Sequence, residues 1–205
     1  SHKVIHMPQS IILASGSSIR ADMLTQAGIA FEVMKPRVDE ESVKVGMLAE
    51  QAKPRDIADT LAEIKARKIS DKMPGVFVLG CDQVLDHRGT LLSKPETPED
   101  AVTQLTALRG DTHSLLSAAV ICENGEPIWR HIGQVRVRMR DASDAYIQDY
   151  VDRNWDSIRH SVGGYKIEEE GVRLMASIEG DYFSVLGMPL LQLLAFLTVR
   201  GVVQA

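Results

Sequence analysis

Hydrophobic and polar positions in this chain alternate between short strand-like runs and longer stretches with helical spacing. An apolar run at residues 10–15 predicts a strand, and a turn of small residues at 16–18 leads into a helix with Leu24 and Ala27 facing inward. A second strand is expected at residues 31–34. The chain is therefore expected to open with a strand, a short turn, a helix and another strand.

The next segment is predicted to place an aspartate at the end of a buried strand. A proline and an acidic cluster interrupt the pattern, so a loop is expected around residues 38–40, and a long helix follows at 54–69. Residues 76–81 are apolar on both faces, which is typical of a central strand. We expect this strand to end at Asp82, before a hairpin at residues 87–89.

Strands and helices remain mixed in the C-terminal half. The expected elements are a helix from 97 to about 110, strands at 114–122 and 134–140 joined by a turn at 124–125, a helix around 146–150, a strand at 172–178 and a last helix at 189–197. This mixture, with its hairpins, predicts an α/β fold with a mixed, twisted sheet and flanking helices.

The length of 205 residues suits a single domain over residues 1–205, with two lobes around a central cleft. Residues 1–7 are expected to be tag-derived or disordered, because Ser1 stands where a natural chain begins with Met. The last helix is strongly apolar, so it is expected to pack against its own core or against a second copy of the chain in a homodimer.

Composition and charge narrow the class of protein. Hydrophobic residues make up 44% and charged residues 25% of the chain, as in ordinary globular proteins. The net charge of -5 disfavours a nucleic-acid partner, and the arginines within residues 136–140 alternate with apolar residues as on a half-exposed strand. No apolar run is long enough to span a membrane, so we expect a cytoplasmic protein without a membrane partner.

Cysteine and histidine give no sign of a metal centre. Cys81 and Cys122 lie in apolar runs and predict buried, reduced thiols. The histidines show no spacing typical of metal ligands, so no zinc site is expected.

A turn with phosphate-binding chemistry follows the first strand. Ser15 and Ser17 supply hydroxyl groups, the following helix supplies its N-terminal N–H groups, and Arg20 supplies a guanidinium. The alternative is a serine N-cap with a solvated arginine, and the turn lacks the Gly-Lys-Ser/Thr sequence of a Walker A loop.

Asp82 is the second candidate centre, with Gln83 beside it and Lys94 across the expected hairpin. From its position alone, Asp82 is a turn former, a partner of Lys94, a metal ligand or a general base for water. Glu40 and Lys65 are equally open when each is taken alone. The residues by themselves do not choose among these roles.

Seven motifs in order resemble those of the Maf family of house-cleaning nucleotide pyrophosphatases, over nearly the whole chain. They are LASGSSIRADML at 13–24, VDE at 38–40, LAEIKA at 61–66, GCDQV at 80–84, SKP at 93–95, LRGDTH at 108–113 and VLGMPL at 185–190. The resemblance implies a Maf/ITPase-like fold, and hydrolysis of a nucleoside triphosphate to its monophosphate and pyrophosphate with a divalent cation, Mg²⁺.

The same resemblance implies a role for individual residues. Asp82 falls at the position of the proton acceptor, and Glu40 at that of a catalytic or metal-linked carboxylate. The positions that bind phosphate and substrate are Ser15, Ser17, Arg20, Lys65 and Lys94.

Three further positions bear on the choice of base. Members of the 7-methyl-GTP type resemble this chain in having Gln and Glu where it has Gln83 and Glu168, whereas the dTTP/UTP type has Thr and Gln. A carboxylate suits a guanine-like edge because it accepts hydrogen bonds and favours a cationic ring. Ile19 departs from the family, which has Trp or Arg there, and residues 161–170 are more acidic than the usual segment.

These positions favour 7-methyl-GTP or another modified nucleotide as substrate. Two alternatives remain: a dTTP/UTP pyrophosphatase, and a nucleotide-binding regulator of cell division without significant catalysis. A pure binder needs no base, so an intact Asp82 favours an enzyme.

Overall fold

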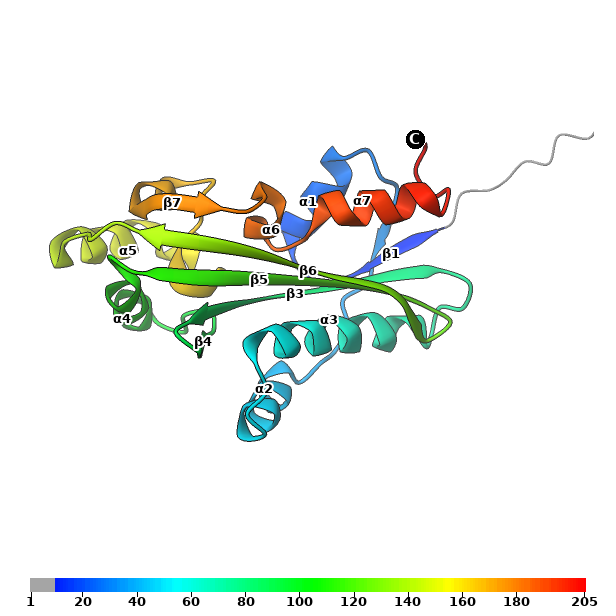
Figure 1. Ribbon diagram of the computed structural model, residues 1–205, viewed down its shortest axis with the longest axis horizontal. Helices are drawn as coiled ribbons and strands as arrows, with labels where there is room; N and C mark the ends of the chain where they lie inside the picture. The colour runs from blue at the N-terminus through cyan, green and yellow to red at the C-terminus, as the bar shows by residue number, and fades with distance from the viewer. Residues whose placement is uncertain (1–9) are drawn as a thin grey trace, which may run out of the picture.

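A mixed seven-stranded sheet runs along the whole molecule (Figure 1). The computed structural model describes residues 10–205, so the segment expected to be tag-derived or disordered lies outside the described residues. The strands are β1 (Ile11–Ala14), β2 (Glu32–Val33), β3 (Phe77–His87), β4 (Thr90–Leu92), β5 (Thr112–Glu123), β6 (Glu126–Met139) and β7 (Met175–Glu179). Their order is β2-β1-β3-β5-β6-β7, with β4 paired to β3. Because β1 pairs in parallel and the other neighbours of β3 are antiparallel, the predicted mixed α/β sheet is confirmed.

Helices cover both faces of this sheet. They are α1 (Ser18–Gln26), α2 (Glu40–Ala49), α3 (Pro54–Ser70), α4 (Pro98–Leu108), α5 (Asp144–Ile158), α6 (Tyr182–Leu186) and α7 (Leu190–Val199), with two short 3-10 segments, η1 (Val162–Gly164) and η2 (Glu170–Leu174). Helix α3 packs on one face, while α1 and α7 pack on the other, and α4 and α5 form a third core at the far end of the sheet (Figure 1).

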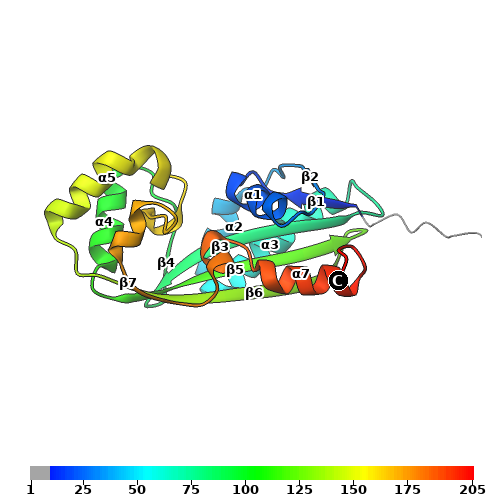
Figure 2. The ribbon, with the colours of Figure 1, turned by 90° about the horizontal axis from the view of Figure 1, so that it is seen from above.

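The arrangement has the two expected lobes. Figure 2 shows α4, α5 and the 3-10 segments grouped at one end and α1, β1 and β2 at the other, with β3, β5 and β6 continuing beneath both. One cavity is lined from both lobes, by Ile19 of α1 and by residues 161–162 and 165–168, with Gln83 and Leu115 of the sheet between them. The predicted cleft therefore lies where the long strands pass from one lobe to the other.

The edge of β3 is open in the middle of its length. β1 pairs with β3 only as far as Gly80, and β4 pairs with it only from Leu85 onward. Within the sheet of the described residues, residues 81–84 thus have a strand neighbour, β5, on one side only. Since ligands of α/β sheets bind beyond the carboxyl ends of parallel strands, this gap at the end of β1 is a natural site.

Helix α3 lies unusually close to the same strand. A Cβ atom built on Gly80 would come within 2.2 Å of the carbonyl oxygen of Ala62 in α3. Only glycine permits this approach, because a methyl group would force the helix or the strand to move. The contact brings Lys65, one turn further along α3, against the open part of β3.

Three expectations about local structure are wrong. β3 does not end at Asp82 but continues to His87, because β5 pairs with it from Val78 to Asp86. The acidic stretch that begins at residues 38–40 is a loop only as far as Asp39, which caps α2 by accepting a hydrogen bond from the N–H of Ser42 at 3.1 Å; Glu40 is the first helical residue. Ala27 caps α1 and is exposed, while Leu24 is buried as expected.

The boundaries of the C-terminal half differ in detail. β6 begins at Glu126, directly after the predicted turn, the last strand begins at Met175 and is preceded by η2, and the short helix α6 was not foreseen. Leu190, Leu193 and Leu197 of α7 are buried against the chain's own core. Homodimerisation remains a prediction.

Both cysteines are buried free thiols, as predicted. Among residues 10–205, no helix combines the length and the apolar character needed to cross a lipid bilayer.

Candidate active site

The centre of the site is a lysine between two carboxylates. The ammonium of Lys65 lies 3.0 Å from Oδ1 of Asp82 and 2.8 Å from Oε1 of Glu40. It also donates to the backbone carbonyl of Cys81 at 3.2 Å, on the open stretch of β3. Three elements, β3, α3 and the start of α2, thus bring together three residues that the motifs predicted.

Asp82 is the most buried charged group of this centre, with 6% of its surface exposed. Burial raises the pKa of Asp82, and the nearby charges of Lys65 and Arg20 offset the rise only in part. Its second carboxylate oxygen, Oδ2, is buried and accepts no hydrogen bond from any group in residues 10–205. A buried carboxylate oxygen without a partner and with raised proton affinity is chemically able to accept a proton.

Glu40 differs from Asp82 in its environment. Burial works to raise the pKa of Glu40, but Lys65, with smaller contributions from Lys44 and Lys94, outweighs it and holds the pKa below its ordinary value. The side chain is 44% exposed, so it remains open to solvent and to a ligand. The two carboxylates are therefore tuned in opposite directions, which is the usual basis for different roles in one site.

The turn between β1 and α1 is built as a cradle. Oγ of Ser15 accepts a hydrogen bond from the N–H of Ser17 at 3.0 Å, and Oγ of Ser17 caps α1 by accepting from the N–H of Arg20 at 3.3 Å. The side chain of Arg20 is held by Gly187, whose carbonyl accepts from Nε at 2.9 Å. This contact fixes the guanidinium beside the positive end of α1, which suits a phosphate.

Lys94 and Lys35 add two cations around this cradle. Partial desolvation, and then the charges of Arg20 and Lys65, lower the pKa of Lys94, although its side chain stays exposed. Lys35 lies across the turn, where a Cβ atom on Gly16 would come within 3.1 Å of its Cε. Lys35 was not predicted to be near this site, because only the parallel pairing of β2 with β1 brings it here.

The three candidate specificity residues line one cavity. Ile19, Gln83 and Glu168 all face the cavity between the lobes, together with Tyr165 and Val185. Every residue predicted for substrate or specificity is thus gathered around the open edge of β3.

Gln83 is also part of the cavity wall. Its Nε2 donates to the carbonyl oxygens of Val185 at 2.8 Å and Ser184 at 3.2 Å, and to Oγ of Ser117 at 3.1 Å. These partners were not predicted, because they lie far from Gln83 in the sequence.

Comparison with known proteins agrees with this arrangement. Residues 10–200 match the family described as Maf-like protein. The chain belongs to the Maf family. The resemblance found in the motifs is thereby confirmed.

Relatives of this Maf chain carry names that describe one reaction. A protein named nucleoside triphosphate pyrophosphatase from Roseobacter denitrificans is 70% identical over 95% of this chain and 98% of its own length, and one of the same name from Ruegeria pomeroyi is 66% identical over 96% and 99%. A protein from Brucella abortus named 7-methyl-GTP pyrophosphatase is 40% identical over 92% of this chain and 95% of its own length. A solved structure of a HAM1 protein from Coxiella burnetii matches at 17% identity, with a TM-score of 0.43, over 65% of this chain and 74% of that chain.

The Maf site has a donor set that suits a divalent cation only in company with a ligand. Residues 10–205 contain no group of three or more histidine, cysteine, aspartate or glutamate side chains placed so that they could hold a metal ion together. They do contain the carboxylate of Glu40, which is 44% exposed and shares the ammonium of Lys65 with Asp82. Mg²⁺ is usually held by one or two carboxylates together with substrate phosphates and water, so this carboxylate fits a magnesium ion that arrives with a nucleotide.

Proposed function

We propose that this Maf protein hydrolyses a nucleoside triphosphate to a nucleoside monophosphate and pyrophosphate, with Asp82 as general base. The observation that carries the proposal is the buried, unpartnered Oδ2 of Asp82, beside an ammonium and at the open edge of β3. The names of the relatives support the same reaction. An intact base argues against a pure nucleotide binder.

The reaction follows from these groups. A water molecule that donates a hydrogen bond to Oδ2 of Asp82 attacks the α-phosphorus and loses a proton to that carboxylate. The new O–P bond replaces the bond to the oxygen that bridges the α- and β-phosphates, so pyrophosphate leaves with the bonding electrons. Arg20, Lys65 and Lys94 neutralise the phosphate oxygens while charge develops on the leaving group.

The proposed metal is Mg²⁺, with the exposed carboxylate of Glu40 as its ligand from the protein. When bound, it would neutralise phosphate charge and orient the triphosphate. Lys65 contacts both carboxylates and so holds Asp82 and Glu40 close together before the nucleotide binds.

Product analysis tests the reaction directly. We expect the purified protein with Mg²⁺ to release pyrophosphate and a monophosphate from at least one of 7-methyl-GTP, GTP, UTP and dTTP, and to stop when EDTA removes the metal. Release of orthophosphate alone would reject a pyrophosphatase. Tight nucleotide binding without any turnover would instead establish the regulatory alternative.

The substrate we propose is 7-methyl-GTP or a related nucleotide with a cationic purine ring. Glu168 and Gln83 line the same cavity, and the exposed carboxylate of Glu168 is free to face a ligand. A carboxylate accepts hydrogen bonds from the ring N–H and the exocyclic amine of guanine, and it favours a positive ring. The Brucella relative, named for this substrate, supports the choice.

Replacing Glu168 by glutamine tests the base assignment. We expect kcat/KM for 7-methyl-GTP to fall about tenfold or more, because a charge-assisted hydrogen bond is lost, while the value for UTP changes little. Asp22→Asn is the matched control, since Asp22 lines the neighbouring groove with Glu168 but not the cavity that contains Gln83. Equal losses for both nucleotides in Glu168→Gln would refute a role in base selection.

A further inference from the structure

Three consecutive glutamates at 168–170 have three different environments. Glu168 faces the cavity, whereas the carboxylates of Glu169 and Glu170 turn back toward α5. The segment that leads into η2 and β7 is therefore acidic for a structural reason, and two of its three carboxylates are bound to α5.

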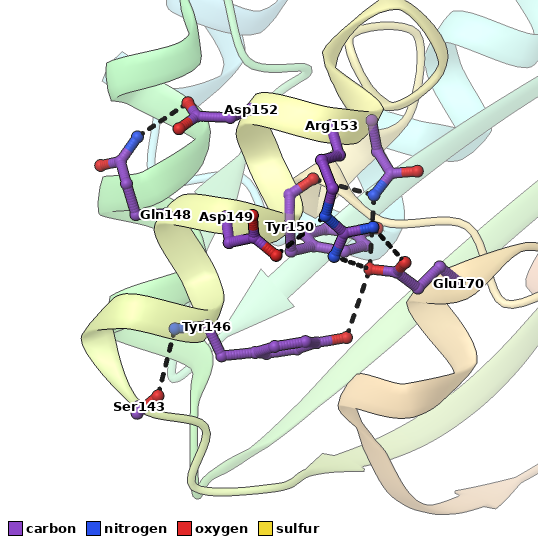
Figure 3. Close-up of polar contacts among 9 residues, drawn as sticks. Ser143, Tyr146, Gln148, Asp149, Tyr150, Asp152, Arg153 and Glu170 are labelled. Atoms are coloured by element: carbon purple, nitrogen blue, oxygen red, sulfur yellow. Dashed lines mark hydrogen bonds and ion pairs between the residues drawn. The ribbon is translucent and has the colours of Figure 1, made fainter.

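Glu170 is bound by a fork of hydrogen bonds. Nη1 of Arg153 lies 2.6 Å from Oε1 of Glu170, and Nη2 lies 2.8 Å from Oε2. The hydroxyl of Tyr146 and the side-chain amide of Asn154, both on α5, also donate to Oε2, at 3.3 Å and 3.4 Å. Figure 3 shows Arg153 and Tyr146 of α5 directed toward Glu170.

The side chain of Arg153 is also held by a second carboxylate on its own helix. Its Nε lies 2.8 Å from Oδ2 of Asp149, one turn earlier on α5 (Figure 3). The helix is anchored to the core by Ile147, Tyr150 and Val151, all of which are buried. A bidentate arginine–carboxylate pair sets orientation as well as distance, so α5 dictates where Glu170 lies.

The segment from 165 to 171 is also held at several points, both to other elements and within itself. The hydroxyl of Tyr165 lies 2.6 Å from Nε2 of the buried His113, and Oε1 of Glu169 accepts from Ser157 of α5 at 2.6 Å. A Cβ atom on Gly171 would come within 2.4 Å of the carbonyl oxygen of Lys166. The segment thus has little freedom between these anchors, and Glu168 lies in the middle of it.

We propose that Arg153 and Glu170 are positioning residues for nucleotide recognition: their ion pair holds the 165–171 segment so that Glu168 faces the cavity. This inference rests on the proposed function, because it assigns the cavity to the base of the nucleotide. Neither residue lines the cavity, so both act through Glu168.

The ion pair is tested by Glu170→Gln, which keeps the size of the side chain and removes its charge. With the best substrate among 7-methyl-GTP, GTP, UTP and dTTP, we expect KM to rise about tenfold and kcat to change by less than about twofold. Preference among the four nucleotides should weaken as well. A residue with a merely structural role would leave that preference intact.

Two further variants separate positioning from general damage. Arg153→Gln breaks the same contact from an exposed position on α5 and is expected to reproduce the effect even if Glu170→Gln does not fold. Asp152→Asn removes another carboxylate of α5, which accepts from Gln148 at 2.9 Å and does not contact Arg153 or the segment, and is expected to leave KM and preference unchanged.

A double-mutant cycle with Glu168→Gln decides whether the effect passes through Glu168. If it does, Glu170→Gln adds little once Glu168 is already glutamine. Additive effects, an unchanged KM in both Glu170→Gln and Arg153→Gln, or an equal loss of kcat with every nucleotide would overturn the inference. If the unmodified protein releases no pyrophosphate, the proposed function fails and the inference falls with it. An active protein whose variants behave like the parent overturns the inference alone.

Discussion

Replacing Asp82 by asparagine is expected to lower kcat by about 10²- to 10⁴-fold, the contribution of a positioned general base. The substitution keeps the size of the side chain and an oxygen that can accept from Lys65, but the amide cannot take a proton from water. Nucleotide affinity should change little, because Arg20, Ser17 and Lys94 remain in place. Pyrophosphate release under saturating nucleotide measures the loss, and equilibrium binding of the same nucleotide measures the affinity.

Asp86→Asn is the matched control for this variant. Asp86 lies on the same strand, but its carboxylate accepts from the N–H of Gly89 at the β3–β4 hairpin and not from the central lysine. Activity close to that of the parent is expected. Retained turnover in Asp82→Asn would remove the assignment of the base.

The dependence of kcat/KM on pH provides a second test of Asp82 as the general base. Burial raises the pKa of Asp82 above the ordinary carboxyl value of 3.8. As the pH is lowered, kcat/KM should therefore start to decrease at a pH higher than 3.8. The rate falls with decreasing pH because only the ionised carboxylate accepts a proton. In Asp82→Asn, this acid limb should disappear from the residual rate.

Elements with strong local signals were predicted well from the sequence. Helix α4 begins where Thr97 caps it, with Pro98 at the first helical position and acids in the first turn. Helix α2 was missed because none of its residues is fully buried, and its apolar residues include the exposed Val45 and Leu48, which blur the helical pattern. The continuation of β3 past Asp82 was missed because it depends on pairing with β5, which is distant in the sequence.

In the site, too, the residue types were predictable from the sequence, whereas their contacts across the fold were not. The motifs drew attention to Arg20 and to Gly187, but nothing local indicates that the two are joined across the fold by a hydrogen bond. The open edge of β3 arises because β1 stops at the level of Gly80 and β4 starts at that of Leu85, and both lengths are set by pairing. A sequence pattern can therefore identify which residues have suitable chemistry. Where these residues come together in space depends on how the strands pair.

Replacing Lys65 by methionine is expected to cost about 3–5 kcal/mol of unfolding free energy near pH 8, the usual cost of removing one partner of a buried ion pair. Lys65 and Asp82 have only 13% and 8% of their side-chain surface exposed, so the remaining carboxylate would be left buried and charged without its ion-pair partner. Glu40 is much more exposed and can turn to water. Denaturant unfolding measures the change, with Lys68→Met, an exposed lysine of the same helix, as a control expected to cost less than about 1 kcal/mol.

The loss in Lys65→Met should depend on pH in one direction. The charge of Lys65 lowers the pKa of Asp82, so its removal raises that pKa further above the ordinary value of 3.8. A carboxyl group with a raised pKa in the folded state stabilises the fold below its ordinary pKa, and this stability is lost as the pH rises through the raised value. The variant should therefore lie closest to the parent near pH 4 and fall progressively behind it toward pH 8. Adding Asp82→Asn removes the buried charge and should recover most of the deficit at pH 8, whereas a deficit that persists in the double variant would show that packing, and not charge, is responsible.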